Sequence, residues 1–294
     1  MPQVPLLTAL TVLPAVLSAQ DPSVGWVGDP PRQGAFAYVE VRAASEPVAV
    51  RGTLRGVPLF FERLGPDRFV ALAGVALDAA DSLLLGVRLV YDGGRMVRHE
   101  RYLPVTAGQF ASERLSVAPE FTRRPDSALA ARIARENAAA AEVSRLALRT
   151  RRLWREAFAP PREGRITSAY GTGRVFNGAV QSRHWGVDFD GAMGAPVHAA
   201  GRGVVALVGD FYYAGRVVYL NHGAGVVTAY LHLSAVDVAE GDTVATGQRL
   251  GAVGQSGRVT GPHLHWAARY GATSLDGTTL LALPAFDALR DGTR

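Results

Sequence analysis

Residues 35–105 alternate short apolar runs with turn residues. In the run YVEVRA, Val39 and Val41 alternate with Glu40 and Arg42, which is the period-two pattern of a strand that buries one face. The sequence YDGG, between two further apolar runs, is typical of a hairpin turn. Strands at this spacing predict a small antiparallel β-sandwich of immunoglobulin-like type, which we place at residues 20–112.

The pattern changes at residues 125–158, which are rich in alanine, arginine and glutamate and have few apolar positions. Asp126 or Ser127 can cap the start of a helix here. We therefore predict a long helix that lies against one or both flanking domains, within a helical linker at residues 113–160. A nucleic-acid-binding arginine helix is the alternative, but glutamates interrupt the basic residues and favour a solvated face.

Short apolar runs return from Arg165 to about Tyr270, and glycines separate them. GVVALVG, RVVYLNHG and VVTAYLHL are examples, and no helical periodicity intervenes. We predict a mostly antiparallel sheet in a second domain at residues 161–276, followed by a tail at 277–294. The chain as a whole is thus expected to be mainly β.

The N-terminus holds an apolar run from Val4 to Leu17, which is too short to span a bilayer comfortably. It ends in the small residues Ser18 and Ala19 before the polar sequence QDPS. This pattern predicts a secretory signal peptide over residues 1–19. Because the run lacks a positively charged start, an uncleaved anchor or a disordered start is the alternative. No other stretch suits a transmembrane helix, so we expect no membrane span after processing.

Composition narrows the possible chemistry. A chain of 294 residues makes one large or two ordinary domains. The absence of cysteine excludes disulfides, thiolate metal ligands and a thiol nucleophile. All 31 basic residues are arginines, and their excess over the 26 acidic residues gives a net charge of +5. This charge favours an anionic partner. The arginines are scattered without an aromatic-interleaved basic patch, so nucleic acid is not the expected partner.

Two short motifs each contain a pair of polar residues. In RHWGVDFD, His184 and Asp188 are four residues apart, and we expect an extended segment because Gly186 disfavours a helix. In TGPHLHW, His263 and His265 are two apart, so on a strand they share a face while the intervening leucine packs behind them.

A third motif, TAYLHLS, alternates Tyr230 and His232 with Leu231 and Leu233. We expect the leucines to face the core and the tyrosine and histidine to face an open groove. The polar side chains of these three strand segments can converge on one groove of an antiparallel sheet.

Catalytic zinc sites use three protein ligands, commonly imidazoles and a carboxylate, and leave a fourth position for water. His184, Asp188 and one histidine of the HLH pair would supply such a set and lower the pKa of the water to about 7. The two remaining histidines can act as a general base and as donors to an oxyanion. The spacing alone leaves open which histidine of the pair binds metal.

The motifs H-x-G-V-D, Y-L-H-L and T-G-P-H-L-H resemble those of the lysostaphin-type zinc metallopeptidases, the glycyl-glycine endopeptidase family that cuts peptidoglycan cross-links. The resemblance spans residues 166–270 and includes ITSAYGTGR before the first histidine. It implies an antiparallel sheet with an open groove and one zinc ion per chain. It implies that His184, Asp188 and His265 bind the zinc and that His232 and His263 form the catalytic pair.

The remaining candidates have weaker signals. Tyr170, in ITSAYGTGR, is either an oxyanion or substrate contact or a packing residue. We interpret His198 as structural, His222 as a turn residue, Asp190 as solvated or as a support for the ligands, and His99 as a surface residue.

We therefore expect an exported zinc metalloendopeptidase of the periplasm or cell envelope that acts on peptidoglycan peptide stems or cross-bridges. The alternatives are a non-catalytic module that activates other wall hydrolases and a wall-binding module with structural zinc. All three ligand positions and both catalytic positions are filled, which argues against the first alternative. Structural zinc sites usually use four protein ligands, which argues against the second. The sequence predicts no oligomeric state.

Overall fold

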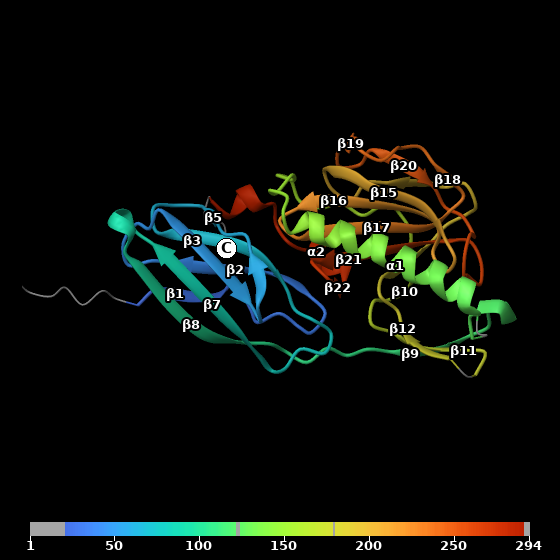
Figure 1. The fold of residues 1–294 in the computed structure, drawn as a ribbon, viewed down its shortest axis with the longest axis horizontal. Coiled ribbons are helices and arrows are strands. Elements are labelled where there is room, and N and C mark those ends of the chain that lie inside the picture. Colours follow the sequence, from blue (N-terminus) through green and yellow to red (C-terminus); the bar gives the residue numbers. More distant parts are fainter. Residues whose placement is uncertain (1–20, 122–123, 179, 291–294) are drawn as a thin grey trace, which may run out of the picture.

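The computed structural model describes residues 21–121, 124–178 and 180–290. The predicted signal peptide at residues 1–19 lies outside the described residues. The protein is mainly β, as expected, and two β-rich parts lie side by side along its long axis (Figure 1).

The N-terminal part contains two four-stranded sheets, with strand orders β1-β2-β6-β5 and β4-β3-β7-β8. YVEVRA lies in β2, where Val39 and Val41 are fully buried, and YDGG turns between β7 and β8, so both predictions are confirmed. The immunoglobulin-like topology stays a prediction. The strands are β1 Ser23–Trp26, β2 Phe36–Arg42, β3 Ala49–Leu54, β4 Val57–Leu59, β5 Glu62–Arg63, β6 Arg68–Gly74, β7 Ser82–Val90 and β8 Met96–Pro104.

The C-terminal part is built on an eight-stranded sheet in which every pairing is antiparallel, as predicted. The order is β10-β13-β21-β17-β16-β15-β19, with β22 paired to β21. These strands are β10 Ile166–Ser168, β13 Val187–Asp190, β15 Gly203–Phe211, β16 Gly215–Gly223, β17 Val226–Leu233, β19 Thr243–Val244, β21 His263–Tyr270 and β22 Thr273–Leu275. A small sheet of β14 Pro196–His198, β20 Arg249–Ala252 and β18 Ala235–Val236 flanks it.

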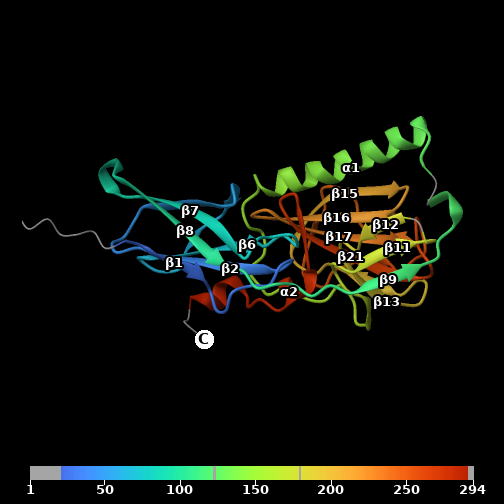
Figure 2. The same cartoon turned by 90° about the horizontal axis from the view of Figure 1, so that it is seen from below.

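Strand β9, Ser112–Leu115, links the two parts in an unexpected way. It runs out from the N-terminal part and pairs in parallel with β11, Gly173–Phe176, which also pairs with β12, Val180–Arg183 (Figures 1 and 2). The strand spans the predicted boundary between residues 112 and 113. The domain boundaries themselves stay predictions.

The predicted long helix is α1, Ser127–Ala147, and the Asp126 side chain accepts a hydrogen bond from the Leu129 amide at 2.8 Å to cap it. The helix lies along one face of the eight-stranded sheet (Figure 2). It ends earlier than the pattern suggested, because the amides of Gly225 and Ala224 bond to the carbonyls of Ala147 and Thr150 and turn the chain away. Its buried contacts are Ala140, Val143 and Ala147 against Val217, Tyr219, Val227 and Ala229.

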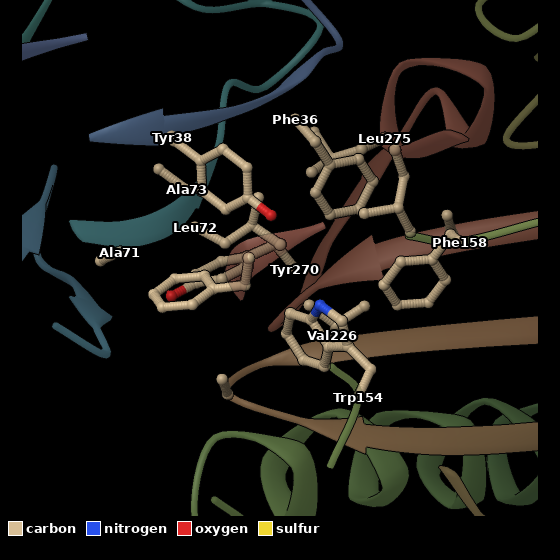
Figure 3. Close-up of a cluster of buried hydrophobic side chains, with 14 of the residues drawn as sticks. Phe36, Tyr38, Ala71, Leu72, Ala73, Trp154, Phe158, Val226, Tyr270 and Leu275 are labelled. Atoms are coloured by element: carbon tan, nitrogen blue, oxygen red, sulfur yellow. The ribbon is translucent and has the colours of Figure 1, made fainter. Parts of the chain in front are cut away.

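The two parts share one hydrophobic core (Figure 3). The Tyr270 hydroxyl, at the end of β21, donates to the Pro58 carbonyl at 2.8 Å, and a Cβ on Gly74 would lie 2.9 Å from the Tyr270 Cβ. Helix α2, Gly277–Leu281, adds a hydrogen bond from the Phe36 amide to Thr279 Oγ1. Phe286, in the 3-10 helix Phe286–Leu289, packs edge-on against Tyr38.

Two further 3-10 helices, Asp92–Gly94 and Pro119–Phe121, complete the fold. Across the described ranges, no helix is long and apolar enough to cross a membrane.

Candidate metal centre

Strand register brings together the motifs that the sequence separates. Asp188 of β13 pairs directly with His265 of β21, so the two side chains share one face of the sheet. His184 lies just before β13 and reaches the same space. Leu264 and Trp266 are fully buried behind the pair of histidines, which confirms the predicted alternation along HLHW.

Three potential ligand atoms form a compact triangle. His184 Nε2 lies 2.9 Å from Asp188 Oδ1 and 2.9 Å from His265 Nδ1, and the last two atoms are 2.8 Å apart. All three residues are largely buried. A single ion could contact all three atoms at once, so this group could hold a metal.

The three facing atoms of this triangle are mostly unprotonated. His184 Nδ1 lies 2.9 Å from the Ala169 carbonyl oxygen, which only accepts, so in the neutral ring the proton is on Nδ1 and Nε2 presents a lone pair. Burial lowers the pKa of His265 to about 4, although Asp188 opposes this shift, so His265 is neutral near pH 7. Three facing acceptors then share at most one proton. A cation would complete the group, and two imidazoles with a carboxylate suit zinc.

Asp188 is held as a carboxylate. Burial raises its pKa, but the two imidazoles beside it outweigh this effect and leave the pKa well below its usual value. Its second oxygen, Oδ2, accepts a hydrogen bond from Arg174 at 2.6 Å. Arg174 in turn donates to Glu113 Oε1 at 2.6 Å and to Ser168 Oγ at 2.9 Å. This chain of contacts orients Oδ1 towards the two histidines.

Gly186 allows the H-x-G-V-D segment to lie close to the TGPHLHW segment. A Cβ at this position would lie 2.5 Å from His265 Nε2 and 2.6 Å from the Trp266 carbonyl oxygen. Real side chains essentially never come so close, so the glycine of H-x-G-V-D lets β13 and the segment before it lie directly against His265.

The predicted catalytic histidines lie beside the triangle. His263 Nε2 is 3.8 Å from Asp188 Oδ1, and the His232 ring centroid is 5.0 Å from that of His263 and 5.8 Å from that of His265. Each donates from Nδ1 to a backbone carbonyl at 2.8 Å, Ser256 for His232 and Gly261 for His263. Each neutral ring therefore presents a lone pair on Nε2. Burial, together with His265 and His263, lowers the pKa of His232 to about 3.

The predicted alternation along TAYLHLS is wrong for Tyr230 and Leu231, whereas Leu233 is fully buried and His232 lines the groove, as expected. Tyr230 is fully buried and its hydroxyl accepts a hydrogen bond from the Ala200 amide at 2.7 Å, whereas Leu231 pairs with His265 and lines the groove. His232 has φ of +63°, a left-handed conformation that is rare outside glycine. This break in the strand turns His232 to the groove side directly after Leu231.

A groove of about 390 Å³ lies over the site. Asp188, His232 and His263 line it, as do residues of β9 and of the loop before β21. Helix α1 covers Val227 and Ala229 on the same sheet face, so the groove occupies the part of that face beyond the helix.

The other candidates lie outside the triangle. Tyr170 is buried and donates to the Ser274 carbonyl at 2.7 Å, so of its two predicted roles the structure supports packing. His222 lies within β16 and is fully buried, so its interpretation as a turn residue is wrong.

Asp190 lines the groove, where its Oδ1 accepts a hydrogen bond from the Arg165 amide at 2.8 Å. His198 is half-buried in β14, and His99 is half-buried in β8 opposite Val87.

Sequence reasoning missed Arg174 and Glu113. Neither is in a motif with the ligands, and they meet only because β9 pairs with β11 across 61 residues, from Ser112 to Gly173. The available signal for Arg174 was ITSAYGTGR, which ends at this residue, but the motif was given no role for the arginine. Nothing in the sequence indicated the partner of β11.

Comparison with known proteins agrees with this geometry. The model of the family described as "Peptidase family M23" matches residues 182–277. The peptidoglycan DD-endopeptidase ShyA of Vibrio cholerae is 48% identical over 83 residues, which make up 28% of this chain and 19% of the relative. The DD-carboxypeptidase/endopeptidase Mpg of Neisseria meningitidis is 42% identical over 101 residues, 34% of this chain and 23% of the relative. The chain therefore spans about a fifth of the length of these curated relatives.

A crystal structure of a Pseudomonas aeruginosa protein assigned to peptidase M23 is similar over both parts of the molecule. It is 26% identical, the match covers 86% of this chain and 96% of that one, and the TM-score is 0.66. The motif spacing, the strand register that assembles the motifs and these similarities lead to one conclusion: residues 182–277 of this chain form a domain of peptidase family M23.

Proposed function

We propose that the protein is a zinc metalloendopeptidase that hydrolyses peptide cross-links of bacterial peptidoglycan. The observation that carries the proposal is the triangle of His184 Nε2, Asp188 Oδ1 and His265 Nδ1, whose three acceptors share at most one proton. These residues would hold one zinc ion per chain.

Zinc, when bound, supplies a Lewis acid that polarises a carbonyl oxygen and lowers the pKa of a water molecule to about 7. The protein supplies the proton transfers. His263 and His232 hold Nε2 lone pairs towards the groove because their Nδ1 protons bond to backbone carbonyls. One histidine accepts the proton of the attacking water on Nε2 and then passes it to the leaving amine. The other takes up a proton from solvent on Nε2 and donates a hydrogen bond to the developing oxyanion.

The relatives support this substrate class. Two of them are named as a peptidoglycan DD-endopeptidase and a DD-carboxypeptidase/endopeptidase, and they are 48% and 42% identical to this chain over 83 and 101 residues. A groove that is open to solvent suits a polymeric substrate. A substrate in the cell wall also requires export to the periplasm or cell envelope, which agrees with the signal peptide predicted at residues 1–19.

The test is digestion of purified peptidoglycan by the chain without residues 1–19, with the released peptides identified by mass spectrometry. We expect uncross-linked peptides, no release with a chelator or with His265→Ala, and recovery on addition of zinc to the wild type. Elemental analysis should give one zinc per chain. A folded, zinc-loaded protein that cleaves no wall preparation would contradict the proposal and favour a regulator of other hydrolases.

A further inference from the structure

Arg258 lies in the groove wall, on the loop between β20 and β21 that leads to His263. Its guanidinium carbon lies 4.5 Å from the ring centroid of Phe176 and 4.5 Å from that of Tyr213. Phe176 ends β11, and Tyr213 is in the turn between β15 and β16. Three separate segments therefore meet at this cation, and the two rings fix its position without neutralising its charge.

The loop that carries Arg258 is firmly anchored. The Arg258 amide donates to the Tyr213 carbonyl at 2.8 Å, and Ser256 Oγ donates to the Leu233 carbonyl at 3.0 Å. Gly257 has φ of +76° and lies against the backbone of the turn before β16, where a Cβ would collide. The Ser256 carbonyl is also the group that orients His232. One rigid loop thus places both a proposed catalytic histidine and Arg258.

The charge of Arg258 has no protein partner in the described part of the chain. Arg174, which also lines the groove, donates to Asp188 and Glu113, but no carboxylate or carbonyl there accepts a hydrogen bond from the Arg258 guanidinium. Burial lowers its pKa below the usual value. A partly buried guanidinium with five N–H donors and no acceptor is unfavourable unless water or a ligand satisfies it.

The other arginine of the groove is already paired. Arg174 bonds to both Glu113 and Asp188, so among the described residues that line the groove Arg258 is the arginine that a substrate group can still pair with. A single carboxylate matches the planar fork of an arginine and carries one charge. We infer that Arg258 binds a free carboxylate of the peptide substrate beside the metal centre. The inference rests on the proposed function for the substrate being a peptide.

Binding measurements test this inference separately from catalysis. The probes are N-acetyl-D-alanyl-D-alanine and its C-terminal carboxamide, titrated by calorimetry into the protein as purified without residues 1–19. A hydrogen-bonded charge pair contributes about 1.5–3 kcal/mol, so the acid should bind about 10- to 100-fold more tightly than the amide. Arg258→Met should abolish the preference, and Arg258→Lys should keep part of it. Arg114→Gln, on an exposed position of β9, is the matched control and should change nothing.

Equal binding of acid and amide to the wild type, no binding of either, or a preference that survives in Arg258→Met would overturn the inference. Melting temperatures should be compared first, because Arg258 also packs on two rings. If Arg258→Met unfolds, Arg258→Lys decides, since loss of the planar fork should still weaken the preference. A protein that binds the acid selectively but cleaves no peptidoglycan would contradict the proposed function and leave the carboxylate site standing.

Discussion

The eight-stranded sheet carries histidines on both faces, and the two sets are bonded differently. On the core face, His222 donates from Nδ1 to the Arg202 carbonyl at 2.8 Å, and its Nε2 lies 2.7 Å from Thr228 Oγ1. Both ring nitrogens are satisfied and the ring is fully buried. This is how a histidine serves as a fixed part of a core.

On the groove side, three histidines use one ring nitrogen for orientation and leave the other without a hydrogen-bond donor from the described residues. His184, His232 and His263 each donate from Nδ1 to a backbone carbonyl, and each turns Nε2 towards other acceptors or the groove. The contrast shows that burial and residue type do not separate a structural histidine from a functional one. The difference is whether the second ring nitrogen accepts a hydrogen bond from a donor in the protein.

The largest expected effect comes from removing a groove-face proton acceptor. We expect His263→Gln to lower kcat about 10²- to 10⁴-fold, the usual contribution of general acid–base catalysis, with the zinc content unchanged. Cleavage rates on cross-linked peptides and elemental analysis check this. Loss of the zinc together with the activity would instead make His263 a ligand.

Gly186 offers a second way to disturb the groove face. We expect Gly186→Ala to lower kcat/KM about 100-fold, because a methyl group there displaces the His265 ring and a shift of about 1 Å has this cost. Gly25→Ala is the matched control, since nothing lies within 4 Å of a Cβ at that position of β1. Equal activity of both variants would mean that the contact at His265 relaxes freely.

A smaller effect should follow from Arg174→Gln, which leaves the three ligand residues intact. Loss of the contact to Asp188 Oδ2 should weaken zinc affinity or activity about 10- to 100-fold, as for other groups that support metal ligands. Zinc competition with a fluorescent chelator measures it. Arg165→Gln, an exposed arginine with an ion pair at 3.8 Å, serves as the control and should bind zinc normally.

The smallest effect on activity is expected for His222→Gln, which should stay within about twofold of the wild type if it folds. The substitution should instead change how the free energy of unfolding depends on pH. Burial lowers the pKa of His222 to about 4 from 6.5, so below pH 6.5 the unfolded chain takes up a proton that the folded protein refuses. Stability therefore falls as the pH drops from 6.5 towards 4, by about 2 kcal/mol at pH 5 from this group.

Urea unfolding at pH 7.5 and pH 5, with a chelator present to remove linkage to metal, measures this contribution. The variant should lose about 2 kcal/mol less than the wild type between the two pH values. A wild type and variant with the same pH dependence would show that His222 titrates alike in both states.

The expectation that His184, Asp188 and His265 bind a metal came from the family resemblance, because spacing alone left open which histidine of HLH is the ligand. The strand period gave the alternation along HLHW, but not the register that pairs Asp188 with His265. The alternation failed at Tyr230, because His232 adopts a positive φ and its amide bonds to the Ala214 carbonyl at 2.9 Å. A one-residue irregularity of this kind reverses the faces, and no residue type in TAYLHLS signals it.

Longer-range features were beyond a single sequence. The parallel pairing of β9 with β11 joins segments that have no local signal for each other, and it is this pairing that brings Glu113 to Arg174. The early end of α1 depends on the amides of Ala224 and Gly225, more than 70 residues downstream. Tertiary contacts of this kind override local propensity.

Strand β21 connects the site to the other half of the molecule. His263 and His265 lie at its start, and Tyr270 at its end is packed beneath the N-terminal sheets and bonded to Pro58. The two halves should therefore melt in one cooperative transition rather than two. A fragment that begins at residue 161 would lack Trp154 and Phe158 and expose the tyrosine end of the strand. The shared core therefore predicts that the two halves fold and unfold as one unit.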